Sequence, residues 1–138
     1  MKMDLQALMD AFAESGRRER SRYHLTLGAL IEALRSAPSD AVVRFDYMDC
    51  SPGEPHSYRG YYSDLSFDRS AEPITVSQFL DTAVCCLGGT YEGYKGGDFL
   101  MTEDTPLWAA SYGCCGRAIV GHHVNNGNVV LLTKEVDL

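Results

Sequence analysis

The sequence lacks the features that mark membrane-spanning and exported proteins. No apolar run approaches the roughly 20 residues that a transmembrane helix requires. The first 30 residues contain no continuous apolar stretch with a small-residue cleavage site, so we expect no signal peptide. The five cysteines are an odd number, and two pairs are adjacent, which favours free thiols. We therefore expect a cytoplasmic protein with no membrane partner.

The common metal and catalytic motifs are also missing. The sequence has no C-x-x-C or H-E-x-x-H spacing, no phosphate-binding G-x-x-x-x-G-K-[ST] and no G-x-S-x-G. Adjacent pairs such as Cys85-Cys86 and His122-His123 would point to opposite faces of a strand, so only one of each pair could reach a shared metal. We expect no metal, no cofactor and no catalytic residue.

Weaker catalytic arrangements remain open as alternatives. A cysteine nucleophile with a histidine base is one of them, and a set of carboxylates acting on a nucleotide or holding Mg²⁺ is another. The candidates are Cys50 with His56, Cys114 with His122, and the set Asp64, Asp68 and Asp98.

Basic residues are scarce outside the N-terminus. The chain has 12 basic and 19 acidic residues, and a net charge of −7. Residues 1–23 hold five bases and four acids, whereas residues 24–138 hold seven bases and fifteen acids. So acidic a body repels the backbone of a nucleic acid, which excludes polymeric nucleic acid as a partner. One arginine and a few backbone N–H groups could still hold a small anion.

The N-terminal residues predict a short amphipathic helix over residues 4–15. Its apolar positions are Leu5, Leu8, Met9 and Phe12. Residues 16–20 indicate a hinge or a solvated turn. Because a helix of about three turns is marginal alone, it either joins the core or docks on another subunit. We expect a helical arm over residues 1–22, a single domain over residues 23–138, and a homo-oligomer.

Two further helices have clear start signals. Thr26 is the expected N-cap of one helix, and Thr75 with Gln78 forms the capping box of another. Gly88-Gly89 is expected to end the second. The expected apolar faces are Leu27, Leu30, Ile31 and Leu34 in the first helix, and Val76, Leu80, Ala83, Val84 and Leu87 in the second.

Short strands account for much of the remaining chain. We expect strands at residues 41–46, 64–68, 99–101 and 107–112, and a hairpin of residues 117–123 and 128–134 around Asn125-Asn126-Gly127. Two prolines and a glycine in residues 47–57 predict a loop. The predicted fold class is α+β: a small antiparallel sheet with two helices packed on one face, and an N-terminal amphipathic helix.

Two blocks that combine tyrosine and glycine are the most unusual stretches. They cover residues 56–62 and 91–99, and their tyrosine–glycine motifs lie 33 residues apart. A tyrosine ring offers a flat apolar face, arginine can grip a phosphate, and glycine lets the backbone approach a ligand. We expect the blocks to lie side by side and, with the only tryptophan, to form a ligand-binding site. Its residues are His56, Tyr58, Arg59, Gly60, Tyr61, Tyr62, Tyr94, Lys95, Gly96, Gly97, Phe99 and Trp108.

Structural roles are the alternative for each of these stretches. The first block also fits an aromatic strand packed on the core, with Arg59 paired to an acid. The second fits a glycine-rich hairpin, and Trp108 fits an anchor of the core.

The order of the motifs resembles a family of small uncharacterised phage and prophage proteins. The similarity spans roughly residues 25–121, and it rests mainly on the blocks S-Y-R-G-Y-Y and G-Y-K-G-G-D-F. The family has no catalytic assignment to transfer. By looser analogy, phage proteins of this size act as sponges that bind nucleotide signals of host immunity, of the Thoeris and CBASS kinds, without cleaving them.

The resemblance and the blocks together predict a binding protein. It would sequester a small nucleotide-derived immune signal in the host cytoplasm without cleaving it. The alternatives are an acidic inhibitor of a host defence protein and a small nucleotide hydrolase.

Overall fold

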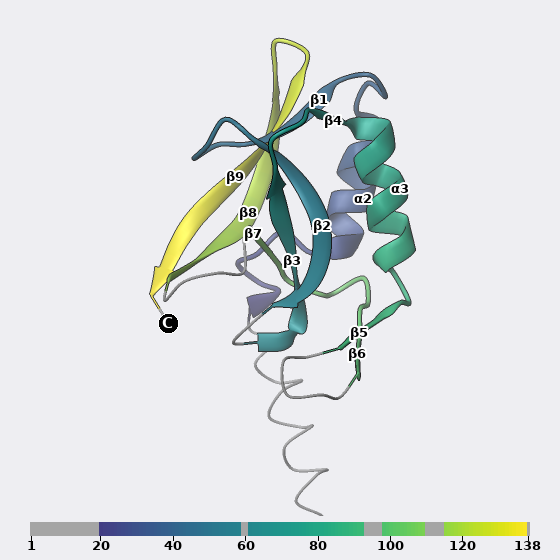
Figure 1. The fold of residues 1–138 in the computed structure, drawn as a ribbon, viewed down its shortest axis with the longest axis vertical. Helices are drawn as coiled ribbons and strands as arrows, with labels where there is room; N and C mark the ends of the chain where they lie inside the picture. The colour runs from purple at the N-terminus through teal and green to yellow at the C-terminus, as the bar shows by residue number, and fades with distance from the viewer. Residues whose placement is uncertain (1–19, 59–60, 93–97, 110–114, 138) are drawn as a thin grey trace, which may run out of the picture.

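The computed structural model describes residues 20–58, 61–92, 98–109 and 115–137 (Figure 1). It contains helices α2 (Leu27–Ser36) and α3 (Val76–Cys86). The strands are β1 (Val42–Phe45), β2 (Ser51–Tyr58), β3 (Tyr61–Ser70), β4 (Ile74–Thr75), β5 (Thr90–Glu92), β6 (Asp98–Leu100), β7 (Leu107–Ala109), β8 (Cys115–Asn125) and β9 (Asn128–Asp137). The predicted helix over residues 4–15 lies outside the described residues.

The sheet has seven strands in the order β2-β3-β7-β8-β9-β1-β4, and β5 and β6 form a separate hairpin. Neighbouring strands are antiparallel except in the pairs β1–β9 and β3–β7. The two ends of the sheet approach each other, since the backbone N–H of Ile74 in β4 donates to Ser51 Oγ in β2 over 3.1 Å. Both helices lie on one side of this sheet (Figure 1), so the predicted α+β class is confirmed.

The two helices begin where the sequence predicts. Thr26 Oγ1 accepts a hydrogen bond from the backbone N–H of Ala29. Thr75 and Gln78 exchange both bonds of a capping box, at 3.2 and 2.9 Å. These side chains satisfy backbone donors that the first turn of a helix leaves open. Gly88, just past α3, has a φ of +79°, which glycine adopts readily.

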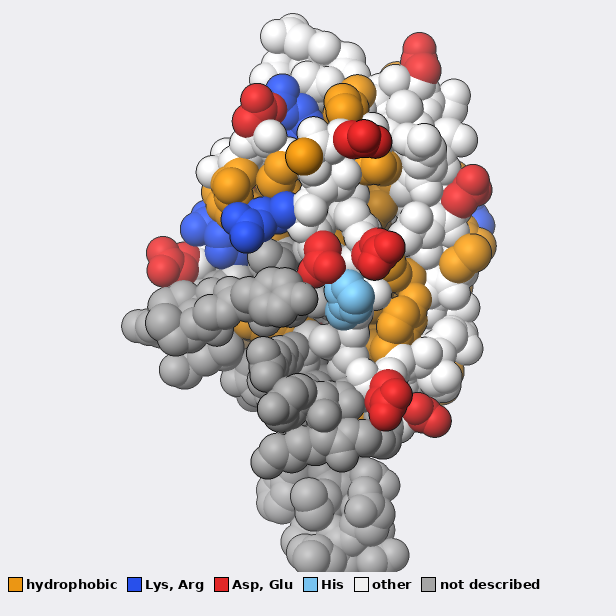
Figure 2. All heavy atoms as spheres, viewed as in Figure 1, with side chains coloured by type: hydrophobic (Ala, Val, Ile, Leu, Met, Phe, Trp, Pro, Cys, Tyr) orange, Lys and Arg blue, Asp and Glu red, His pale blue; other side chains and the backbone are white. Residues whose placement is uncertain are grey.

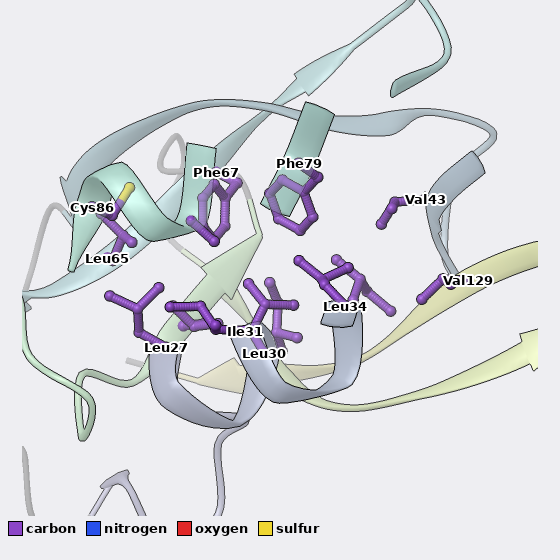
Figure 3. Packing of buried hydrophobic residues seen from close by; sticks show 14 of the residues in the cluster. Leu27, Leu30, Ile31, Leu34, Val43, Leu65, Phe67, Phe79, Cys86 and Val129 are labelled. Carbon is purple, nitrogen blue, oxygen red and sulfur yellow. The ribbon is translucent and has the colours of Figure 1, made fainter. Parts of the chain in front are cut away.

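The core lies between the helices and the sheet. Leu27, Leu30, Ile31 and Leu34, the predicted face of α2, are all buried. Figure 3 shows them turned toward the side chains of β3, α3, β1 and β9. The other labelled members of this cluster are Val43, Leu65, Phe67, Phe79, Cys86 and Val129.

The predicted face of α3 needs correction. The buried residues are Val76, Phe79, Ala83 and Cys86, whereas Val84 and Leu87 are exposed and Leu80 is only partly buried. The Phe79 ring meets the edge of Phe67 in β3, with their centroids 4.9 Å apart. Packing of α3 against α2 and β3 at the same time sets this rotation, and apolar periodicity alone does not record it.

The predicted loop over residues 47–57 is wrong in its second half, because residues 51–58 form β2. Pro52 and Pro55 cannot donate to a ladder, but β2 is a terminal strand and pairs on one side only. The register with β3 shifts between these two prolines, which is where a bulge absorbs the irregularity. Prolines therefore mark the edge of this sheet rather than a loop.

The closing hairpin is confirmed. β8 and β9 are joined by Asn126 and Gly127, with φ values of +49° and +79°. Positive φ at both residues is the signature of a type I′ turn, whose twist suits a hairpin. Strands are also confirmed at residues 42–45, 61–70, 98–100 and 107–109, whereas residues 110–112 lie outside the described chain.

The described surface carries few bases. On the face in Figure 2, most of the Lys and Arg side chains gather on the left, and Asp and Glu side chains are scattered over the whole described face. Within the described ranges, no helix is both long enough and apolar enough to cross a bilayer.

Candidate functional site

The two strand pairs that flank the tyrosine–glycine blocks lie next to each other. The turn of the β2–β3 hairpin follows Tyr58, which pairs with Tyr61, and the β5–β6 hairpin closes on the pair Glu92–Asp98. β5 contacts β2 and β6 contacts β3, and in Figure 1 the β5–β6 hairpin lies level with the lower ends of β2 and β3. The strands that carry the two blocks are therefore side by side, although the turns themselves, residues 59–60 and 93–97, lie outside the described chain.

A buried carboxylate lies beside this junction, on the sheet face opposite the helices. Asp64 in β3 is fully buried. Its two oxygens accept from Arg20 Nε at 2.6 Å and Arg20 Nη2 at 2.9 Å, and Trp108 Nε1 donates to Oδ2 at 2.9 Å. A buried charge is tolerated only when it is paired and hydrogen-bonded, and here three donors meet that need. Residues 16–20 were predicted to be a hinge or a solvated turn, and Arg20, the one of them that the structure describes, is bound to a buried carboxylate.

Trp108 stands at the centre of an aromatic stack. The Tyr58 ring lies nearly parallel to it, with centroids 4.0 Å apart, and the His24 ring meets it edge-on at 4.6 Å. His24 Nδ1 lies 3.1 Å from the carbonyl oxygen of Leu107, so this nitrogen carries the proton. Burial lowers the pKa of His24, and the contact with Leu107 opposes that effect. Tyr58, His24 and Trp108 thus form a packed unit above Asp64.

An exposed histidine–carboxylate pair lies at the rim of this unit. His56 Nε2 in β2 is 2.8 Å from Asp68 Oδ2 in β3. Asp68 Oδ1 is buried, and no described residue donates to it. His56 is opposite Ser66, and Ser66 is opposite Trp108, so one row across three strands runs from the exposed histidine to the buried indole. His56 is the member of the row that solvent reaches.

A hollow lies at the other end of β2, near Ser51. It has a volume of about 350 Å³, and its lining includes Arg44, Asp49, Cys50 and Glu72. Arg44 forms an ion pair with Asp49. Burial is the main reason that the pKa of Cys50 is raised, so its thiol is protonated at neutral pH. Cys50 lines this hollow whereas His56 binds Asp68, so the described contacts do not join the two residues of the nucleophile pair considered from the sequence.

The structure separates the predicted site residues into three groups. Tyr58 and Trp108 are buried against each other, in the packing role that the sequence left open for Trp108, and they offer no free ring face here. His56 is exposed, and Phe99 is half-buried against the main core. Tyr61 and Tyr62 lie in β3, and the remaining members lie outside the described residues: Arg59, Gly60, Tyr94, Lys95, Gly96 and Gly97.

The alternative carboxylate set does not form one site in the structure. Asp64 is sealed by Arg20 and Trp108, and Asp68 is paired with His56. Asp98 is exposed on β6 in the separate hairpin. In the part of the chain that can be described, no three His, Cys, Asp or Glu side chains are placed to hold a metal ion.

The contact of Arg20 with Asp64 was missed from the sequence. The two residues are 44 positions apart, as are Asp64 and Trp108. One signal was available, since Leu65 and Phe67 point into the core and a strand must then turn Asp64 to the other face. A buried indole N–H also requires an acceptor, and Asp64 supplies it.

Comparison with known proteins gives no relative for this arrangement: no family model matches the sequence, and no curated protein or solved structure is significantly similar to it.

Proposed function

We propose that the protein binds a small nucleotide-derived ligand, without cleaving it, where the β2–β3 and β5–β6 hairpins adjoin. The observation that carries the proposal is the contact of β5 with β2 and of β6 with β3. It brings together the flanks of two blocks that are rich in aromatic residues and glycine and that each supply one base. Such a combination suits a base and a phosphate held at one place.

Some residues of the proposed site support the β2–β3 hairpin, and others contact the ligand. Tyr58 and Trp108 support the β2–β3 hairpin from beneath, because their rings are stacked on each other and buried. Contact with the ligand falls to the two turns and to the first residues of β3. Arg59 and Lys95 hold phosphate, Tyr61, Tyr62 and Tyr94 enclose the base or ribose, and Gly60, Gly96 and Gly97 bring backbone N–H groups close.

Sequestration is the role that this site serves in the proposal. Tight binding alone is sufficient for a sponge, and the resemblance of the sequence blocks to phage proteins makes a nucleotide signal of host immunity the ligand of choice. The acidic body supports a small ligand over a nucleic acid strand, since residues 24–138 carry seven bases and fifteen acids.

Ligand capture tests the proposal directly. The purified protein is incubated with cyclic oligonucleotides and with cyclic ADP-ribose isomers, separated from free ligand, heated, and the released material is analysed by mass spectrometry. We expect at least one of them to be returned intact. Arg59→Ala should weaken uptake at least tenfold, whereas Arg69→Ala, an exposed arginine at the other end of β3, should leave it unchanged. No uptake of any probe, or equal loss in both variants, would contradict the proposal.

A small nucleotide hydrolase is the second candidate, and one contact favours it. A carboxylate that holds one nitrogen of an exposed histidine leaves the other nitrogen to act as a general base, and His56 with Asp68 has this arrangement. In the same experiment, hydrolysis would return altered ligand, and His56→Asn would abolish the alteration while ligand binding persisted. Intact ligand from the unmodified protein decides against it.

A further inference from the structure

An open groove lies on the helix side of the sheet, away from the proposed ligand site. It has a volume of about 550 Å³ between α2 and the β8–β9 hairpin. Its lining is Ala29, Glu32, Ala33, Ser36, Ala37, His122 and Val124. Ala29 and Ala33 lie one turn apart on α2, and Ala37 is the residue that caps its C-terminus, so the groove is lined by a stripe of small side chains. Side chains this small allow the backbone of another helix to approach closely.

β8 forms one wall of the groove. Its residues there lie on the same face of the sheet as core residues, but the helices do not cover them. Val124 is opposite Val129, and His122 is opposite Leu131, in the register of the hairpin. Val129 and Leu131 are buried under the helices, whereas Val124 is 57% exposed. Paired residues lie on the same face of a sheet, so the apolar face extends past the end of its cover. Burial of this extension by a further element would be favourable.

The chain itself supplies an element of suitable length. Residues 1–19 precede the described structure, and residues 4–15 have the pattern of an amphipathic helix. The apolar positions from Leu5 to Phe12 span about 11 Å of helix, and the part of α2 that lines the groove, from Ala29 to Ser36, also spans about 11 Å. The docking segment itself carries three acids and no base, so its fit to the groove depends on apolar area and length.

The place where this segment joins the body indicates whose groove it fills. Arg20 is fixed to Asp64 on the face of the sheet opposite the helices. The groove lies on the helix side of the sheet. The sheet therefore lies between the groove and the point, at Arg20, where the N-terminal segment of the same chain joins the body. No such barrier separates the segment from a second copy. Reciprocal docking would bury two equal interfaces, which is the arrangement of a two-fold dimer.

We propose that residues 4–15 of one copy dock in the α2–β8 groove of a second copy, and that the protein is a homodimer held by this exchange. The apolar side chains of the segment cover the alanine stripe and Val124. The interface involves no residue of the proposed ligand site, so either proposal can fail without the other.

Single variants test the interface through the mass in solution. We expect light scattering after size-exclusion chromatography of the full chain at about 50 μM to give the mass of a dimer. Val124→Glu and Leu8→Asp should each weaken the dimer at least tenfold, because each places a charge in the apolar contact. Val120→Glu is the matched control, since Val120 is exposed on the same strand but does not line the groove. Circular dichroism melting checks that each variant is folded.

A mixing experiment separates this exchange from other ways to dimerise. The Leu8→Asp chain keeps an intact groove, and the Val124→Glu chain keeps an intact segment. Mixing two monomeric variants should therefore restore one of the two contacts and yield a heterodimer. A monomeric unmodified protein, including one whose segment packs on its own body, would overturn the proposal. A dimer that both variants leave intact, or a mixture that stays monomeric, would overturn it as well.

Discussion

The two faces of the sheet are covered in different ways. On one face, α2 and α3 bury a large apolar cluster that includes Phe67 and Phe79. On the other face, the chain just before α2 supplies Arg20 and His24, which close over Asp64 and Trp108. Apolar packing adjusts to substitution by small shifts, whereas a buried ion pair fails when either partner is removed. The stability of one face should therefore depend on volume, and that of the other on charge.

The largest effect is expected on the apolar face. Phe79→Ala should lower the free energy of unfolding by about 4 kcal/mol, since it removes a fully buried ring and leaves a cavity against Phe67. Urea denaturation measures the loss. Val84→Ala on the same helix is the control, and it should cost well under about 1 kcal/mol because Val84 is exposed. A larger loss for Val84→Ala than for Phe79→Ala would mean that α3 has the rotation predicted from the sequence.

The buried charge gives the next effect and the sharpest contrast. Asp64→Asn should cost about 3 kcal/mol, because it leaves the Arg20 guanidinium beside a neutral amide in a buried place. Adding Arg20→Met should then recover part of the stability, because no unpaired charge remains. Urea denaturation of both single variants and the double variant completes the cycle. If the losses from Asp64→Asn and Arg20→Met simply add in the double variant, the two residues are not coupled. The proposed contrast between the two faces of the sheet would then be wrong.

The smallest effect concerns His24. Burial holds its pKa below the ordinary value of 6.5, so the folded protein keeps the ring neutral where the unfolded chain takes up a proton. This difference in proton binding does not affect the free energy of unfolding above about pH 6.5. Below that pH it lowers the free energy of unfolding, and the loss grows as the pH falls. The midpoint of thermal unfolding should therefore decrease less steeply between pH 6.5 and 5 in His24→Phe than in the unmodified protein. His123→Phe, which removes an exposed histidine, should keep the original slope.

Local signals in the sequence were sufficient for much of the fold. The cap at Thr26, the capping box at Thr75 and the turn at Asn126-Gly127 each depend on side chains that satisfy nearby backbone groups, so neighbours in sequence determine them. The face of α3 depends on how Phe79 meets Phe67 across the core, which no local pattern records. The prolines of β2 were mistaken for a loop because their tolerance depends on the position of the strand in the sheet.

The candidate site was less accessible to prediction. The blocks drew attention to the β2–β3 and β5–β6 hairpins, and the contact between them was expected. The functions of Tyr58 and Trp108 depend on which side of the sheet is sealed, and that is decided by Arg20, far away in sequence. Arg20 lies in a charged stretch of the sequence, and nothing in the neighbouring residues indicates that its guanidinium binds the buried carboxylate of Asp64.

The edge prolines have a consequence for how the protein behaves at high concentration. A sheet edge normally offers a row of backbone donors and acceptors to which an extended strand of another molecule can attach, and this is the first step toward fibrils. In β2 two of the eight residues have no N–H to offer, and β4 at the other end of the sheet is only two residues long. Both ends of the main sheet are thus poor templates for main-chain pairing, which leaves the association of copies to side chains.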